Sequence, residues 1–211
     1  MGYQYRFVIA GVEYGMTDVV ASPKLEQPLF DKLSVGNTCS AELDITFWPK
    51  GDIPKMAKIV PYVIDENGTE TKLGEFWTDT REKVGDKLHI IAYDAMMRGD
   101  IVWVPRNDLE FPKDTGLPMP DAVAEICSLM KVELDERTTL SSSYSIDHPA
   151  NNWTLREVLG FIGAAHAGNW IITAEGKLLL VPLFDSMPDG TGCLITEGGN
   201  PITFGGVRIR V

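Results

Sequence analysis

The residues best suited to covalent chemistry lie in one serine-rich stretch. Residues 141–145 read SSSYS, and Asp147 and His148 follow closely, so the residue types of a nucleophile system are present. A catalytic triad needs these groups oriented in space, and a single loop rarely supplies that arrangement. The G-x-S-x-G elbow of many hydrolases is missing from the sequence. We therefore interpret the stretch as a polar loop and expect no enzymatic activity.

Metal and phosphate ligands are present, but not at the spacing that a site requires. Cys39, Cys127 and Cys193 are far apart and form no CxxC pair, and no histidine stands at ligand spacing from them. The Gly-Gly pairs at 198–199 and 205–206 lack the strand–loop–helix context of a phosphate-binding loop. We expect no metal and no cofactor, and we interpret the cysteines as thiols of a reducing compartment.

Glu42 and Asp44 are the remaining candidates for acid–base chemistry. They alternate with apolar residues from Cys39 to Trp48, so both carboxylates lie on one face of a predicted strand. The simpler interpretation is that this face is the solvated side of a sheet. The same carboxylates contribute to a net charge of −11, which repels nucleic-acid phosphates. We therefore expect no specific nucleic-acid binding.

The elements that would position these residues begin with short strands. Alternating runs separated by turns fill roughly the first 100 residues, and one turn, at 65–68, contains the Asn-Gly pair typical of hairpins. No segment approaches the roughly 18 apolar residues of a membrane helix. The sequence therefore predicts a mainly β fold with an α+β part, which starts with a small β-barrel over residues 1–105.

Two stretches interrupt the strand pattern. Residues 16–36 are aperiodic and form a predicted arm, and residues 48–57 form a predicted loop. Their apolar side chains are costly in water unless they meet a partner or pack back on their own barrel, and both alternatives remain open. The candidate subunit-interface residues are Leu25, Leu29, Phe30, Trp48 and Ile53.

A small α+β domain with two helices and a hairpin is predicted over residues 106–190. Asp121 is the expected cap of the first helix. Thr154 and Glu157 form a capping box for the second, and Gly168 is its expected left-handed stop. Arg156 is interpreted as part of a solvated helix face, and His166 as a polar-rim residue near the helix end.

The last segment, 191–211, ends in an alternating pattern. It either returns to the first sheet or begins a second barrel that this chain does not finish.

Three pieces of sequence in this order resemble one family. They are LGEFWTDTREKVGDKLHIIAYDAMMRGD, PDAVAEICSLMKVEL, and a third piece with T-x-R-E-V-L followed by N-W-x-I-x-x-x-G-K-L-x-L-x-P-L, and together they span roughly residues 73–183. The order is similar to that in baseplate hub and tail-tip proteins of bacteriophages. The resemblance implies a tube-like first barrel and a structural role in the virion tail of a particle made in the bacterial cytoplasm.

The resemblance also implies the partners. A hub joins the tail tube or distal tail protein to the central spike or fibre, and it forms a ring with itself, usually a trimer. Two other functions remain open. One is a tail-associated peptidoglycan hydrolase fragment, and the other is a carbohydrate-binding β module that uses Trp48, Trp77 or Trp103.

Overall fold

The computed structural model describes residues 3–27, 35–104, 116–147 and 152–183, and the backbone of residues 203–204 and 207–208. The chain divides into two compact units, Met1–Val181 and Pro182–Val211. In the second unit, β13 (Thr203–Phe204) and β14 (Val207–Arg208) pair with each other as a two-stranded sheet. The rest of the description concerns the first unit, which holds two hydrophobic cores.

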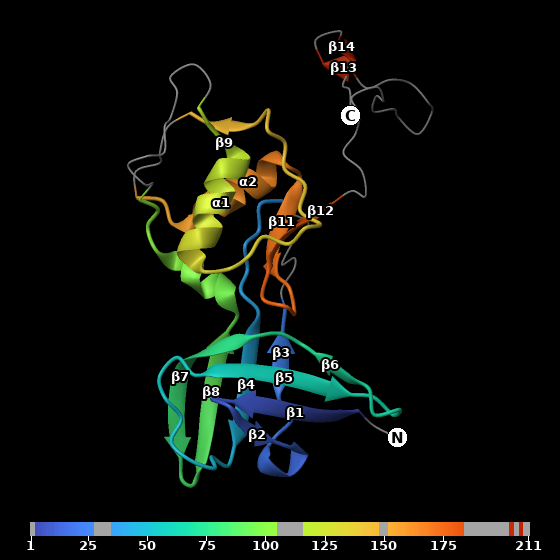
Figure 1. Cartoon of the computed structure of the whole chain (residues 1–211), viewed down its shortest axis with the longest axis vertical. Helices are drawn as coiled ribbons and strands as arrows, with labels where there is room; N and C mark the ends of the chain where they lie inside the picture. The colour runs from blue at the N-terminus through green and yellow to red at the C-terminus, as the bar shows by residue number, and fades with distance from the viewer. Residues whose placement is uncertain are drawn as a thin grey trace. The chain divides into compact units, whose positions relative to one another are not determined.

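An antiparallel sheet of eight strands forms the N-terminal part of the first unit (Figure 1). Its path runs β2-β1-β5-β7-β8-β4-β3, and β6 pairs with β5 off this path. The strands are β1 (Gln4–Ile9), β2 (Val12–Tyr14), β3 (Lys24–Glu26), β4 (Glu42–Phe47), β5 (Lys58–Ile64), β6 (Glu70–Lys72), β7 (Phe76–Val84) and β8 (Lys87–Tyr93).

The first core lies on one face of this sheet. Along β4, Leu43, Ile45 and Phe47 are buried, and the residues between them are only half-buried, as the sequence alternation predicts. The cross-strand partner of Ile45 is Ile90 of β8, which is also fully buried. The predicted mainly β character and the alternation of β4 are therefore confirmed.

The predicted barrel is not confirmed. Among the described strands, the edge strands β2 and β3 do not pair with each other, so the sheet is not closed into a barrel. A 3-10 turn, η1 (Met16–Asp18), separates them, and just after it Val20 N–H donates to Thr46 C=O at 2.8 Å. The first part of the predicted arm is thus ordered against β4 rather than aperiodic.

The second core belongs to the helical part of the unit. A 3-10 segment η2 (Ala95–Asp100) follows β8, and the helices are α1 (Met119–Met130) and α2 (Leu155–Ala165). Two short ladders accompany them: β9 (Leu117–Pro118) with β10 (Ser145–Ile146), and β11 (Gly168–Ile172) with β12 (Leu178–Pro182). Buried residues from both helices, η2 and the β11–β12 hairpin form one cluster, which includes Met96, Ile126, Leu159 and Trp170. The two helices and the hairpin are those the sequence predicts.

Two predicted helix ends are wrong. The cap residue of α1 is Pro118, and Asp121 lies within the first turn. Helix α2 ends at Ala165 with His166 as its C-cap residue, and Ala167 takes the positive φ of +49°. Gly168 instead begins β11, where a Cβ atom would lie 2.9 Å from Val181 C=O. Gly168 is therefore needed because β12 lies close to its backbone, and it does not terminate the helix.

The predicted capping box of α2 is confirmed. Thr154 Oγ1 accepts from Glu157 N–H at 3.2 Å, and Glu157 Oε2 accepts from Thr154 N–H at 2.7 Å. We expect Thr154→Ala to lower the free energy of unfolding by about 1 kcal/mol, because the cap hydrogen bond is lost. Urea denaturation of both proteins measures this. Thr154→Ser keeps the hydroxyl and should unfold like the wild type; equal losses in the two variants would contradict the capping role.

Candidate functional site

The serine-rich stretch does not assemble a catalytic triad from its described residues. The histidine that approaches it is His166, whose Nε2 accepts from Ser141 backbone N–H at 2.9 Å and whose Nδ1 lies 2.8 Å from Ile162 C=O. Both ring nitrogens are therefore engaged with backbone. His166 is 5% exposed, so it is a buried linker between α2 and this loop rather than the predicted rim residue. His148 lies outside the described residues.

The two carboxylates of β4 have different partners on β8. Asp44 Oδ1 lies at hydrogen-bond distance, 2.8 Å, from His89 Nε2. Glu42 makes a hydrogen bond with the Tyr93 hydroxyl, which raises the pKa of Tyr93. Each carboxylate therefore bridges two neighbouring strands on the outer face of the sheet, and together they do not form an acid–base pair.

The cysteines are similarly engaged in structure. Cys39 Sγ donates to Asn37 Oδ1 at 2.8 Å, and burial raises the pKa of the Cys127 thiol to about 11. Cys193 lies outside the described residues. In the part of the chain that the structure describes, no group of three or more histidine, cysteine or acidic residues is arranged to hold a metal ion.

The candidate interface residues fall in different places. Leu25 and Trp48 are exposed on the surface. Ile53 is 3% exposed and packs in the first core, so its side chain contacts its own domain and is not exposed to a partner. Leu29 and Phe30 lie outside the described residues.

A buried aspartate connects the first sheet to the helical part. Asp94 follows β8 directly, and its carboxylate accepts from Ala41 N–H at 3.0 Å and from Met96 N–H at 2.9 Å. It therefore caps η2 and holds the start of β4 at the same time. Burial raises the pKa of this carboxyl from 3.8 to about 6, although the two hydrogen bonds and the Arg156 charge oppose the rise.

The side chain of Arg156 in α2 also connects the helical part to the segment before β4, at the same junction between the first sheet and the helical part. Its Nη2 donates to Ser40 Oγ at 3.1 Å and to Met96 C=O at 3.2 Å, and its Nε lies 2.8 Å from Asp100 Oδ1. The sequence interpretation of Arg156 as a solvated residue is therefore wrong. Its partners are distant in sequence, and no local pattern around the helix identifies them.

The end of the predicted arm is hydrogen-bonded to β11 of the helical part. Gly36 N–H donates to Gly168 C=O, and Trp170 N–H donates to Asn37 C=O, both at 2.8 Å. Asn37 N–H also donates to Asn169 Oδ1 at 2.7 Å. This segment therefore lies along the β11 edge of the hairpin without forming a regular strand, and a shallow groove lies between it and α2.

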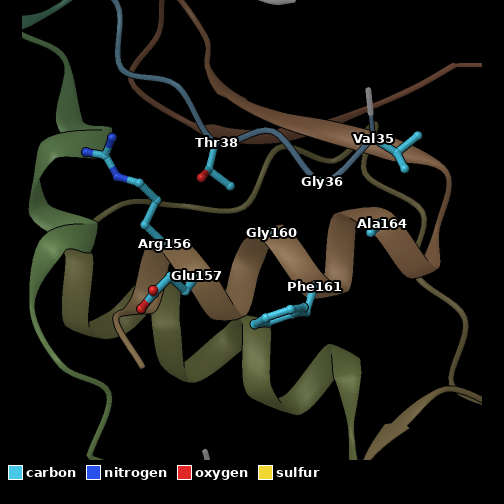
Figure 2. Close-up of a pocket in the computed structure, with 8 residues that line it drawn as sticks. All are labelled: Val35, Gly36, Thr38, Arg156, Glu157, Gly160, Phe161 and Ala164. Atoms are coloured by element: carbon cyan, nitrogen blue, oxygen red, sulfur yellow. The ribbon is translucent and has the colours of Figure 1, made fainter. Parts of the chain in front are cut away.

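The groove has a volume of about 390 Å³, and its lining is mixed (Figure 2). Its lining residues are Val35, Gly36, Thr38, Arg156, Glu157, Gly160, Phe161 and Ala164. Gly36 lies opposite Gly160 in Figure 2, and Phe161 points away from that contact. Phe161 is exposed and stacks on exposed Trp153, with ring centroids 4.3 Å apart. The arrangement suits packing and surface contact, and it brings no nucleophile and base together.

The backbone contact at Gly36 leads to a testable expectation. Gly36 has a φ of +78°, and a Cβ there would lie 2.5 Å from Gly160 C=O. We expect Gly36→Ala to destabilise the protein by more than about 1 kcal/mol, because it adds a steric clash to an unfavourable φ. Gly11→Ala is a matched control, since Gly11 has a φ of +84° but nothing within 4 Å of its Cβ position. Thermal unfolding that finds the two variants equally stable would contradict the close contact.

Comparisons with known proteins find solved structures of similar fold. No family model and no curated protein matches the sequence. The 43 kDa tail protein of prophage MuSo2 from Shewanella oneidensis is 10% identical, with a TM-score of 0.62 over 92% of this chain and 59% of that protein. A tail protein from Neisseria meningitidis MC58 is 12% identical, with a TM-score of 0.59 over 93% of this chain and 56% of the other.

These structural neighbours are phage tail proteins, as the resemblance in the sequence implies. At such low identity the likeness concerns the fold, and this chain spans less than two thirds of the length of either protein. Among the described residues, no helix is long and apolar enough to cross a membrane.

Proposed function

We propose that the chain is a structural component of a phage tail, and that it acts as a baseplate hub or tail-tip protein. The observation that carries this proposal is the fold, which is shared over nine tenths of the chain with two tail proteins. In this role the chain links the tail tube or distal tail protein to the central spike or fibre. The polar side chains considered as candidate site residues, such as Asp44, Glu157 and His166, make structural hydrogen bonds, which supports a role in assembly rather than catalysis.

The first sheet is the part proposed to meet the tube. Its outer face is polar and half-buried, and Leu25 and Trp48 are exposed at its margins. We propose that several copies, most simply three, form a ring through this sheet and the segment between β3 and β4. A closed ring repeats the same contact between identical chains.

Location of the chain in the parent particle tests the proposal. A cryo-EM reconstruction of the tail should place density for both the eight-stranded sheet and the helices α1 and α2 on the tail axis, between tube and spike. Density in a peripheral fibre or outside the particle would overturn the hub assignment, whatever the fold.

The ring contact has a separate test by mutation. We expect the double variant Leu29→Ser and Phe30→Ser to weaken ring formation by the protein, because apolar contact area is lost at the proposed interface. Analytical ultracentrifugation measures the assembled fraction, and circular dichroism checks the fold. Leu129→Ser removes an exposed leucine from α1 and should leave the ring intact. Equal assembly of all three proteins would remove these residues from the interface.

A further inference from the structure

Cationic side chains without acidic partners gather at one end of the first sheet. Elsewhere in the described residues most lysines and arginines form ion pairs, among them Arg6, Lys24, Lys50, Lys58, Lys72, Arg137, Arg156 and Lys177. Arg98 stacks instead on the Trp77 ring, and Lys131 is exposed at the end of α1. The others lie where residues 49–56 meet the β7–β8 hairpin. They are Lys55, Arg81, Lys83 and Lys87.

A cavity of about 320 Å³ lies between this loop and the hairpin. Arg81, Lys83 and Lys87 line it, and Asp52 is the only carboxylate in the lining. Arg81 and Lys83 are two residues apart on β7, so they share one face of the strand. Across the ladder they pair with Ile90 and Leu88, the first of which is buried in the core. Arg81 and Lys83 therefore lie on the same face of the sheet as the first core, just beyond the place where the core ends. Lys55 and Asp79 lie at an adjoining hollow that also includes Arg81.

Uncharged groups hold two of these cations in place. Arg81 Nη1 donates to Ile53 C=O, and Lys87 Nζ lies 5.6 Å from the centroid of the exposed Trp48 ring. A backbone carbonyl and an aromatic face position a cation without neutralising it. The cavity thus presents a fixed positive charge, on a chain whose net charge is −11. A charged group of this kind favours an anionic ligand.

We propose that this cationic end binds carboxylate side chains on a neighbouring copy of the same chain. This inference rests on the proposed ring and names one of its contacts. A second copy carries the same acidic excess, so its surface is complementary to this cavity. The cavity has room for one or two side chains, whereas a DNA backbone would also meet the acidic surface around it.

The contact has a definite symmetry. A cation-lined end repels a second cation-lined end, so two copies do not join through the same patch on both. The contact instead joins the cationic end of one copy to an acidic surface of the other, and in the proposed ring it repeats head-to-tail. Contacts of this type generate rings when the rotation between copies closes.

Self-association of the intact chain tests the proposal. Sedimentation velocity at low salt should show concentration-dependent association, and 0.5 M NaCl should weaken it. The double variant Lys83→Glu and Lys87→Glu should raise the dissociation constant at least tenfold. Lys131→Glu makes the same kind of charge change on α1 and should leave the constant within about twofold, as expected for an uninvolved surface charge. A chain that remains monomeric, or equal effects of both charge reversals, would overturn the proposal.

Carbodiimide cross-linking identifies the acceptors. A mixture of unlabelled and 15N-labelled chains distinguishes links between copies from links within one copy. We expect links between copies from Lys83 and Lys87 to carboxylates, and none from Lys131. Binding of labelled duplex DNA that Lys83→Glu and Lys87→Glu abolish, without links between copies, would make the cavity a nucleic-acid site and contradict the proposal. If the particle reconstruction places the chain on the tail axis but with other contacts between copies, this inference fails and the proposed function stands.

Discussion

Trp170→Ala is expected to lower the free energy of unfolding by about 3–5 kcal/mol, the range for truncating a buried tryptophan. Trp170 is 1% exposed and lies in the second core. Its Nε1 donates to Leu159 C=O at 2.7 Å, and its backbone N–H donates to Asn37 C=O at 2.8 Å. The ring also lies 3.0 Å from the Cβ position of Gly163, so it connects β11 closely with α2. Its loss leaves a large cavity at the meeting point of these elements.

A second tryptophan serves as the matched control. Trp153 is 41% exposed and packs mainly on Phe161. Trp153→Ala should therefore cost at most about 1 kcal/mol, because 41% of its surface already contacts water, against 1% for Trp170. Guanidinium denaturation, followed by tryptophan fluorescence and circular dichroism, gives both values. Similar losses in the two variants would show that the second core is not centred on Trp170.

The second large effect is a dependence on pH that comes from Asp94. The pKa of this carboxyl is about 6 in the folded protein, against an ordinary value of 3.8. The folded state therefore binds a proton more tightly than the unfolded state. Ionisation of the buried group costs about 3 kcal/mol at neutral pH, by the conversion of about 1.4 kcal/mol for each pKa unit. The wild type should regain this stability as the pH falls from about 7 towards 4.

Comparison with Asp94→Asn isolates this contribution from those of other carboxylates. The amide does not titrate, and it replaces one of two acceptor oxygens, so the variant loses one hydrogen bond at every pH. Between pH 7.5 and pH 5 the wild type should gain roughly 1.4 kcal/mol relative to the variant, and more at lower pH. Urea denaturation at both pH values measures the change. A constant difference between the two proteins would mean that Asp94 does not titrate in this range.

Local sequence patterns predicted the elements of the fold well. The capping box of α2, the alternation of β4 and the hairpin of β11 and β12 each depend on neighbouring residues, and all three are confirmed. The helix ends were less accurate, because Gly168 has the residue type of a helix stop but is needed for close approach to β12. The local sequence pattern does not distinguish a glycine that ends a helix from one that allows two strands to approach closely.

Contacts between distant residues could not be predicted in this way. The junction depends on Asp94 and Arg156, whose partners include Ala41 and Ser40, far away in the sequence. The cationic cavity likewise forms only when residues 49–53 fold over β7. For these sites the sequence offers only a polar residue at the end of an apolar run, as at Asp94. An ordinary helix cap has the same pattern, so the pattern does not identify the site.

The hydrogen bonds between the segment at Asn37 and β11 have a consequence for how the chain acquires its structure. Asn37 and Asn169, which are 132 residues apart, join the N-terminal segment to β11. On the ribosome, residues 35–38 emerge long before β11, so these hydrogen bonds form only after β11 has been made. A separately expressed piece from residue 106 onward lacks this segment and exposes the edge of β11. Such a piece should aggregate, and supplying residues 35–38 as a separate peptide should reduce the aggregation by covering that edge.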